Sequence, residues 1–211
     1  MFLRSVLVFV LTAAATTGCR TAAKPELIQP GAPGQSAKVI DSAQASALRA
    51  ARFTPADVEF MQGMIGHHQQ AVEMTDLLNT RTHSDQMKKL GERIQLSQTD
   101  EIRMMERWLQ VRGQSLPDPH AMHMHDAKLM PGMLSAEEME RLSAARGVEF
   151  DALFLAGMIK HHGGALTMVD DLFSHAGAGQ DSEIFSFASD VDADQRMEIA
   201  RMGAMLEERM K

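Results

Sequence analysis

The chain has little cysteine, few aromatic side chains and no excess of basic residues, and each shortage narrows its possible function. Its 211 residues include one Cys, one Trp and no Tyr, against 18 Met. A single thiol cannot close a disulfide within the chain. Because Met far outnumbers Cys, sulfur is present almost wholly as thioether. The net charge of −7 leaves no basic face for neutralising phosphates, which argues against a nucleic-acid-binding protein.

Long hydrophobic runs are also scarce outside the N-terminus. Residues 1–18, "MFLRSVLVFVLTAAATTG", combine one basic residue, Arg4, with an apolar run too short to span a bilayer. They predict a secretory signal peptide. Cys19 then follows small residues, as at bacterial lipoprotein cleavage sites, although Thr16 stands where leucine is usual. We expect lipidation of Cys19 and a membrane anchor, with plain cleavage as the alternative, and a location in the periplasm or cell envelope in both cases.

The rest of the chain divides into a tether and one helical domain. Residues 19–52 carry the anchor cysteine and a Pro- and Gly-rich flexible stretch, with a short leading helix near its end. Capping signals and helical periodicity over residues 53–211 predict long helices at about 54–78, 84–111, 148–174 and 182–210, and a short one from Ser135 that fades at Gly147. No stretch alternates at period two, so we expect no sheet.

One sequence pattern occurs twice. Nine of the 18 positions from Asp57 to Met74 recur 94 residues later, among them "MI-x-HH" at residues 64–68 and 158–162. The following helices match at an offset of 97, through Gln98, Glu101, Ile102, Met105 and Leu109 against Gln195, Glu198, Ile199, Met202 and Leu206. The repeat is therefore a helical hairpin, at residues 53–112 and 135–211, joined by a connection at 113–134. Two hairpins predict an all-α four-helix bundle.

Four histidines, His67, His68, His161 and His162, fall on the apolar faces of the repeated helices. A lone histidine in such a place is more often a core residue that hydrogen-bonds than a metal ligand. Four buried imidazoles are different, because each unpaired polar atom costs about 1 to 3 kcal/mol and the same faces offer mostly apolar neighbours. Metal ions or a polar channel are the partners that we expect.

Methionines accompany these histidines, and most have a simple role as core filling. Met64 and Met158 lie three and four residues before the paired histidines, within reach on one helix. Met74 and Met168 follow one to two turns later, and Met105 and Met202 occupy matching places on the partner helices. We expect one site from Met64, His67, His68 and Met74, and its counterpart from Met158, His161, His162 and Met168.

The connection is the second candidate site. It contains three histidines and four methionines in fourteen residues: His120, Met122, His123, Met124, His125, Met130 and Met133. An accidental composition is the plain alternative to a flexible metal-binding loop. Imidazole and thioether ligands favour soft ions, Cu(I) foremost and also Ag(I), and fit zinc less well. No Asp or Glu stands three residues before any histidine, so the Glu-x-x-His motif of di-iron bundles is absent.

The segments "FMQGMIGHHQQAVEM" and "GMLSAEEMERL...GVEFDALFLAGMIKHHGGALTM" resemble sequences of a bacterial family, domain of unknown function 305. The resemblance covers about Phe53 to Lys211. It implies a ferritin-like four-helix bundle and a periplasmic copper-binding protein linked to copper and silver resistance. It also implies copper binding by the paired histidines and by Met64, Met74, Met158 and Met168. Gly66 and Lys160 depart from the proline that often precedes the first His pair in this family.

We therefore expect an envelope protein that binds Cu(I) or Ag(I), buffers or sequesters it, and exchanges it with other envelope proteins. No nucleophile with a base, phosphate loop or organic cofactor motif is present, so we predict no catalysis. The alternatives are a metal oxidase or reductase that uses the paired sites, and a helical interaction module whose histidines sense acid.

Overall fold

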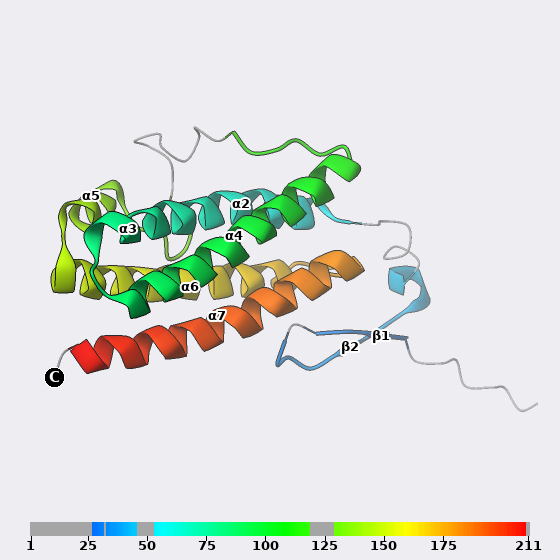
Figure 1. Ribbon diagram of the computed structural model, residues 1–211. Coiled ribbons are helices and arrows are strands. Elements are labelled where there is room, and N and C mark those ends of the chain that lie inside the picture. The colour runs from blue at the N-terminus through cyan, green and yellow to red at the C-terminus, as the bar shows by residue number, and fades with distance from the viewer. Residues whose placement is uncertain (1–26, 32, 46–52, 119–128, 210–211) are drawn as a thin grey trace, which may run out of the picture.

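The computed structural model describes residues 27–31, 33–45, 53–118 and 129–209. The signal peptide, Cys19, and His120, Met122, His123, Met124 and His125 of the predicted loop lie outside these ranges. Four long helices make an antiparallel bundle (Figure 1): α2 at Pro55–Asp76, α4 at Asp85–Val111, α6 at Gly147–Ser174 and α7 at Ser182–Arg209. Two short helices, α3 at Leu78–Arg81 and α5 at Ala136–Ala144, lie between the long ones in the sequence. The prediction of an all-α bundle from two repeated hairpins is confirmed.

Side-chain caps fix where the first helix of each repeat region begins. The Thr54 hydroxyl accepts a hydrogen bond from the Asp57 amide, and the Asp57 carboxylate accepts one from the Thr54 amide at 2.7 Å. Ser135 and Glu138 form the same reciprocal pair at the start of α5. Each such cap stabilises a helix by about 1 kcal/mol, so the helix starts predicted from these residues agree with the structure.

A small hairpin of strands corrects one expectation. Strand β1, Leu27–Gln29, pairs antiparallel with β2, Lys38–Ile40, and Leu27 lies opposite Ile40. The absence of a sheet was therefore a wrong prediction. Strands of three residues are too short to give a period-two signal, and Gly34, with φ of 78°, supplies the turn that brings them together. Beyond β2 the chain is helical at residues 42–45, where a leading helix was expected.

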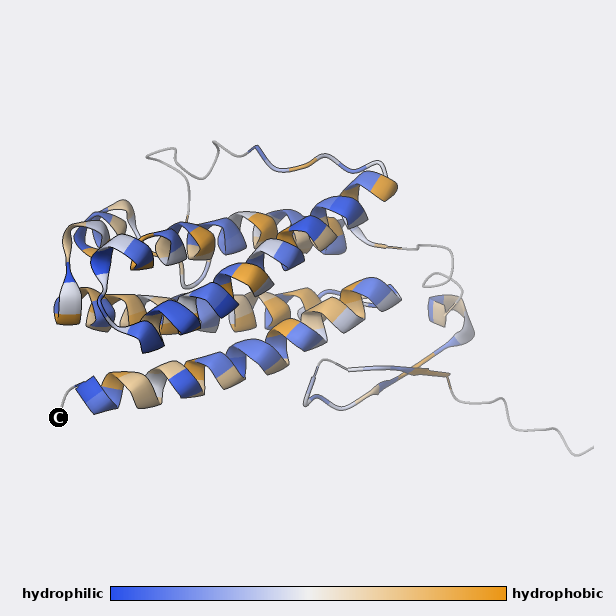
Figure 2. Cartoon of the chain, viewed as in Figure 1, coloured by the Kyte–Doolittle hydropathy of each residue, from blue (hydrophilic) through white to orange (hydrophobic). Residues whose placement is uncertain are grey.

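The two hairpins meet through their first helices. Helix α2 packs along α4 and α6 packs along α7, while α2 and α6 contact each other across the centre of the bundle. One apolar cluster, around Phe60 and Trp108, fills one end, and a second, around Phe150 and Phe154, fills the other. Figure 2 shows polar and apolar residues mixed around each long helix. The histidine pairs of α2 and α6 lie between the two clusters, at the middle of the bundle.

Among the helices at residues 55–111 and 136–209, none is long and apolar enough to cross a membrane.

Candidate metal centre

His67 and His161 lie ring against ring where α2 crosses α6. Their centroids are 3.8 Å apart, and both side chains are almost fully buried. The Nε2 of His161 donates to the His67 carbonyl at 2.9 Å, and the Nε2 of His67 donates to the Pro131 carbonyl at the same distance. A carbonyl only accepts, so each Nε2 carries the proton and each neutral ring keeps its lone pair on Nδ1.

The surroundings keep these two rings neutral. Burial, assisted by the neighbouring His68, lowers the pKa of His67 to about 3. Burial, and after it the neighbouring His67, His162 and His68, hold the pKa of His161 well below its ordinary value. A metal ion binds the neutral form of imidazole, so both rings are in the ligating form without losing a proton first.

His68 and His162 each point to the second helix of their own hairpin, where each meets a carboxylate. The Nε2 of His68 lies 2.6 Å from Glu101 Oε2 on α4, and the Nε2 of His162 lies 2.7 Å from Glu198 Oε2 on α7. A histidine that donates one ring N–H to a carboxylate is fixed in orientation and presents a more basic nitrogen on its other side. The two pairs are equivalent under the repeat, because the glutamates match at the offset of 97.

Unpartnered lone pairs gather in this region. Within the described residues, no hydrogen-bond partner is found for the buried Nδ1 atoms of His67, His68, His161 and His162, or for the Oε1 atoms of Gln98 and Gln195. These glutamines stand one turn before Glu101 and Glu198 on the same helices. In the neutral form of imidazole, which is the form that binds a metal, all six atoms are acceptors. At about 1 to 3 kcal/mol each, they would cost as much as a domain's whole stability, so the centre favours a cation.

Methionines border the histidines at both ends of the bundle. Met64 and Met105 are fully buried in the cluster around Phe60, and Met158 and Met202 are fully buried in the cluster around Phe150. Met74 and Met168 exchange places relative to the sequence-based sets. Met74 lies in the cluster of Met158, and Met168 packs against the cluster of Met64. The reason is that α2 and α6 run antiparallel, so the end of one repeat helix lies beside the start of the other.

A turn of the connecting segment covers the stacked rings. Pro131 and Gly132 lie directly on α6 at Gly164, where an added Cβ would stand 1.9 Å from the Pro131 oxygen. Glycine at 164 is therefore what lets the Pro131 carbonyl approach and accept the His67 proton. Gln70 holds the same segment from α2, because its side-chain amide donates to the Leu134 carbonyl at 2.9 Å and accepts from the Leu134 amide at 2.7 Å.

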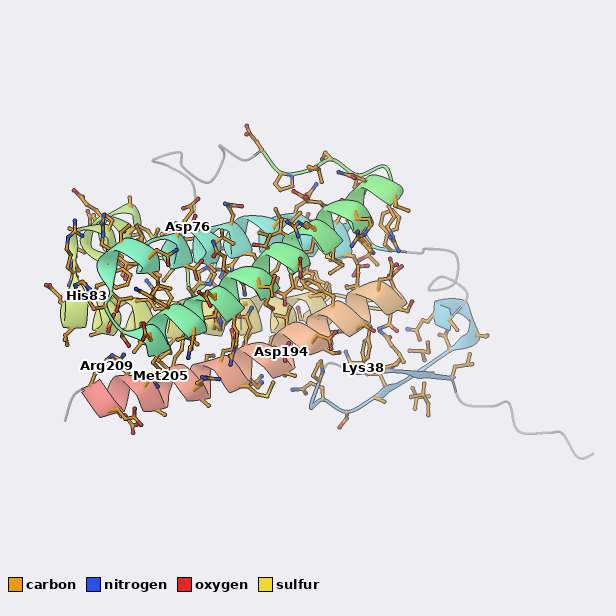
Figure 3. The ribbon with its side chains drawn as sticks, viewed as in Figure 1. Lys38, Asp76, His83, Asp194, Met205 and Arg209 are labelled. Atoms are coloured by element: carbon orange, nitrogen blue, oxygen red, sulfur yellow. The ribbon has the colours of Figure 1, made fainter. Side chains whose placement is uncertain are left out.

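On the opposite side, a groove of about 690 Å³ separates α4 from α7. Beside the rings of Trp108 and Phe187, its walls carry five carboxylates and two guanidinium groups, those of Asp100, Glu101, Glu183, Asp190 and Asp194 and of Arg107 and Arg112. Figure 3 labels Asp194, which lies near the middle of α7. Burial and then the negative charges of Glu101, Asp190 and Glu198 raise the pKa of Asp194. This mutual repulsion indicates a negative potential beside the two glutamates that contact His68 and His162.

The described residues do not by themselves make a closed cage of hard ligands. In residues 27–31, 33–45, 53–118 and 129–209, no three His, Cys, Asp or Glu side chains converge as a metal site would require. Thioether sulfurs are outside that count. Sequence reasoning found the histidines and methionines but did not assign a role to Glu101, Glu198, Gln98 and Gln195. Their recurrence at the offset of 97 was the signal that pointed to them.

Comparison with known protein families shows which family this chain belongs to. The sequence model of the family described as "Domain of unknown function (DUF305)" matches residues 57–206. The chain belongs to the DUF305 family. Two DUF305 structures are similar to it: a protein from Streptomyces coelicolor assigned as secreted, at 30% identity and a TM-score of 0.62, and a fragment from Deinococcus radiodurans, at 31% identity and a TM-score of 0.63. The alignments cover 73% and 74% of this chain, and 93% and 98% of those chains.

This DUF305 protein is also similar to CopM, whose structure is known in a Cu(II)-bound form and a Cu(I)-bound form. The identities are 26% and 25% and the TM-scores 0.60 and 0.57, over 72% of this chain and 96% of CopM. A comparison with curated proteins found no match.

Proposed function

We propose that this DUF305 protein binds Cu(I), and by the same chemistry Ag(I), outside the cytosol, and that it buffers, sequesters or hands on these ions. The observation that carries the proposal is the set of buried acceptors at the bundle centre, above all the four Nδ1 atoms. Copper-bound CopM supports the choice of metal, and the secreted assignment of the Streptomyces coelicolor relative supports the location. Anchoring through a lipid on Cys19 is part of the proposal.

The ligand chemistry accounts for selectivity. Neutral imidazole and thioether groups are the donors that Cu(I) and Ag(I) prefer, whereas magnesium and calcium require oxygen. Nε2 donation to Pro131, His67, Glu101 and Glu198 fixes the four rings with Nδ1 available for an ion. Buried Met64, Met105, Met158 and Met202 border the same region and supply sulfur. The acidic groove between α4 and α7 attracts cations toward Glu101 and Glu198.

We propose binding without turnover. Oxygen consumption by the Cu(I)-loaded protein tests this, because an oxidase would consume oxygen in proportion to added Cu(I) and a binding protein would not. The alternative of an acid sensor is disfavoured by the lowered pKa values of His67 and His161, since neither ring gains a proton in mild acid.

The test is an anaerobic titration of Cu(I) against a competing chromogenic chelator, using soluble chain from Arg20 onward. Its variant changes His67, His68, His161 and His162 to Gln, because the glutamine amide keeps an N–H donor in the place of Nε2 and removes the Nδ1 lone pair. Circular dichroism verifies that the variant keeps its helices, and exposed His83 changed to Gln serves as the control. We expect affinity to fall in the fourfold variant alone. Unchanged affinity in that folded variant would remove the histidines from the site.

A further inference from the structure

A second cavity lies on the face of the bundle where the connecting segment crosses α2 and α6. Its volume is about 420 Å³, and it is bordered by the segment at Met130 and Pro131 and by residues of both helices. Two thioethers line it, those of Met130 and Met168. Both side chains are half-buried, in contrast to the fully buried Met64, Met74 and Met158. The cavity thus brings two sulfur ligands to a place that solvent reaches.

Gly63 on α2 makes the room for these two side chains. A Cβ on Gly63 would stand 3.4 Å from the Met130 sulfur and 3.4 Å from the Met168 terminal methyl. The ends of both thioethers therefore converge on one point of the α2 surface. Their residues are 38 positions apart in the sequence, on the connecting segment and on α6, so helical spacing alone does not explain their meeting.

An imidazole on the border of the cavity is already oriented for metal binding. The Nδ1 of His175 lies 2.8 Å from the Asp171 carbonyl, which only accepts, so Nδ1 carries the proton. In the neutral form, which is the form that binds a metal, the ring keeps its lone pair on Nε2. A ring nitrogen that donates to a backbone carbonyl while the other remains free is the usual arrangement of histidines that bind metals. The carboxylates of Glu59 and Asp171 also border the cavity and favour a cation there.

The repeat contains a natural comparison at the equivalent place. Gly157 matches Gly63, and the methyl of Met74, which matches Met168, would lie 3.3 Å from a Cβ on Gly157. The second side chain there is Leu134, at 3.2 Å, where the first place has Met130. The equivalent place therefore has one thioether beside Gly157. The second thioether at Gly63 is not required by the packing of the repeat, since leucine serves in its counterpart.

We propose that Met130, Met168 and His175 form a soft-ion site at the protein surface, separate from the buried histidines, that takes Cu(I) or Ag(I). The site rests on the proposed function for the identity of its cargo. Met130 directly precedes Pro131, whose carbonyl accepts the His67 proton. An ion held by Met130 is thus one peptide from the segment that covers the stacked rings, which places the site at the entrance to the centre.

The test follows methionine methyl groups by NMR while Ag(I) is added to the soluble chain, residues 20–211, labelled with ¹³C at methionine methyls. Single Met→Leu variants assign the signals of Met130, Met168 and Met74. We expect the Met130 and Met168 signals to shift together in one saturable step. Met130→Leu and Met168→Leu each weaken this step by roughly tenfold or more. Met197→Leu, which changes an exposed thioether on α7, is the control and leaves it unchanged, while Leu134→Met creates a second thioether pair and a new step at Met74.

The outcomes separate the two proposals. If the protein binds Ag(I) but the Met130 and Met168 signals do not move, the surface site is refuted and the buried centre stands. If the two signals shift and the fourfold His→Gln variant keeps this step while losing the others, both proposals are supported. If no methionine signal moves and no Ag(I) is bound, both are overturned.

Discussion

Replacing Gly164 with alanine tests the close approach that covers the buried rings. The new Cβ would stand 1.9 Å from the Pro131 oxygen and 2.4 Å from its carbonyl carbon, so the connecting segment has to move away from α6. That movement breaks the hydrogen bond from His67 and leaves a buried donor unpaired, at about 1 to 3 kcal/mol. Overpacking adds about 1 to 3 kcal/mol, and the gain in helix propensity returns about 1 kcal/mol. We expect a net loss of about 1 to 5 kcal/mol.

Gly163 is the matched control for this change. It precedes Gly164 on the same helix, yet a Cβ there meets no atom of the described residues within 4 Å. Gly163→Ala should therefore stabilise the protein by up to about 1 kcal/mol. Urea denaturation of both variants and the wild type, followed by circular dichroism, measures the difference. Equal stability of the two alanine variants would refute the reasoning that the Pro131 carbonyl is seated on α6.

Two further predictions concern pairs of side chains between helices. Glu101→Ala removes the acceptor of the His68 Nε2 proton and should lower the free energy of unfolding by about 1 to 3 kcal/mol. The same loss should be absent when His68→Ala is already in place, and a double-mutant cycle measures this coupling. Arg112→Met should destabilise the protein most at neutral pH. Burial raises the pKa of Asp181, but the hydrogen bond and charge of Arg112 outweigh it and lower the pKa overall. The stability from this pair is present above about pH 4 and is lost as the pH falls through the lowered value. Unfolding midpoints of wild type and variant, measured from neutral pH to pH 2, should converge in acid, and a constant gap would contradict the assignment.

The helices could be predicted because their signals are local. Thr54 with Asp57 and Ser135 with Glu138 mark helix starts within four residues of sequence, and the repeat then fixes how many long helices exist. The strand pairing of Leu27–Gln29 with Lys38–Ile40 could not be predicted, because it depends on a turn and on pairing between very short segments. The repeat also predicted which faces carry histidine, since that depends on helical spacing alone.

The site was predicted less completely because it depends on contacts between helices. Helical spacing grouped Met74 with Met64, whereas the antiparallel crossing packs it in the cluster of Met158. Glu101 and Glu198 recur at the offset of 97, but they gain their role only when α4 and α7 bring them to His68 and His162. The contact of Pro131 with His67 joins residues 64 apart and leaves no periodic signal.

The turn at Pro131 and Gly132 also limits how this bundle can be engineered. In many helical bundles the connection between hairpins is exchangeable, and designers shorten, lengthen or cut it freely. Here its last residues pack onto the bundle, because Met133 and Leu134 are buried and the Pro131 carbonyl accepts the His67 proton. A circular permutant or a split protein that removes them would expose the His67 proton donor and open α6 at Gly164. Substitutes for this connection therefore need to end before Leu129 and keep the turn intact.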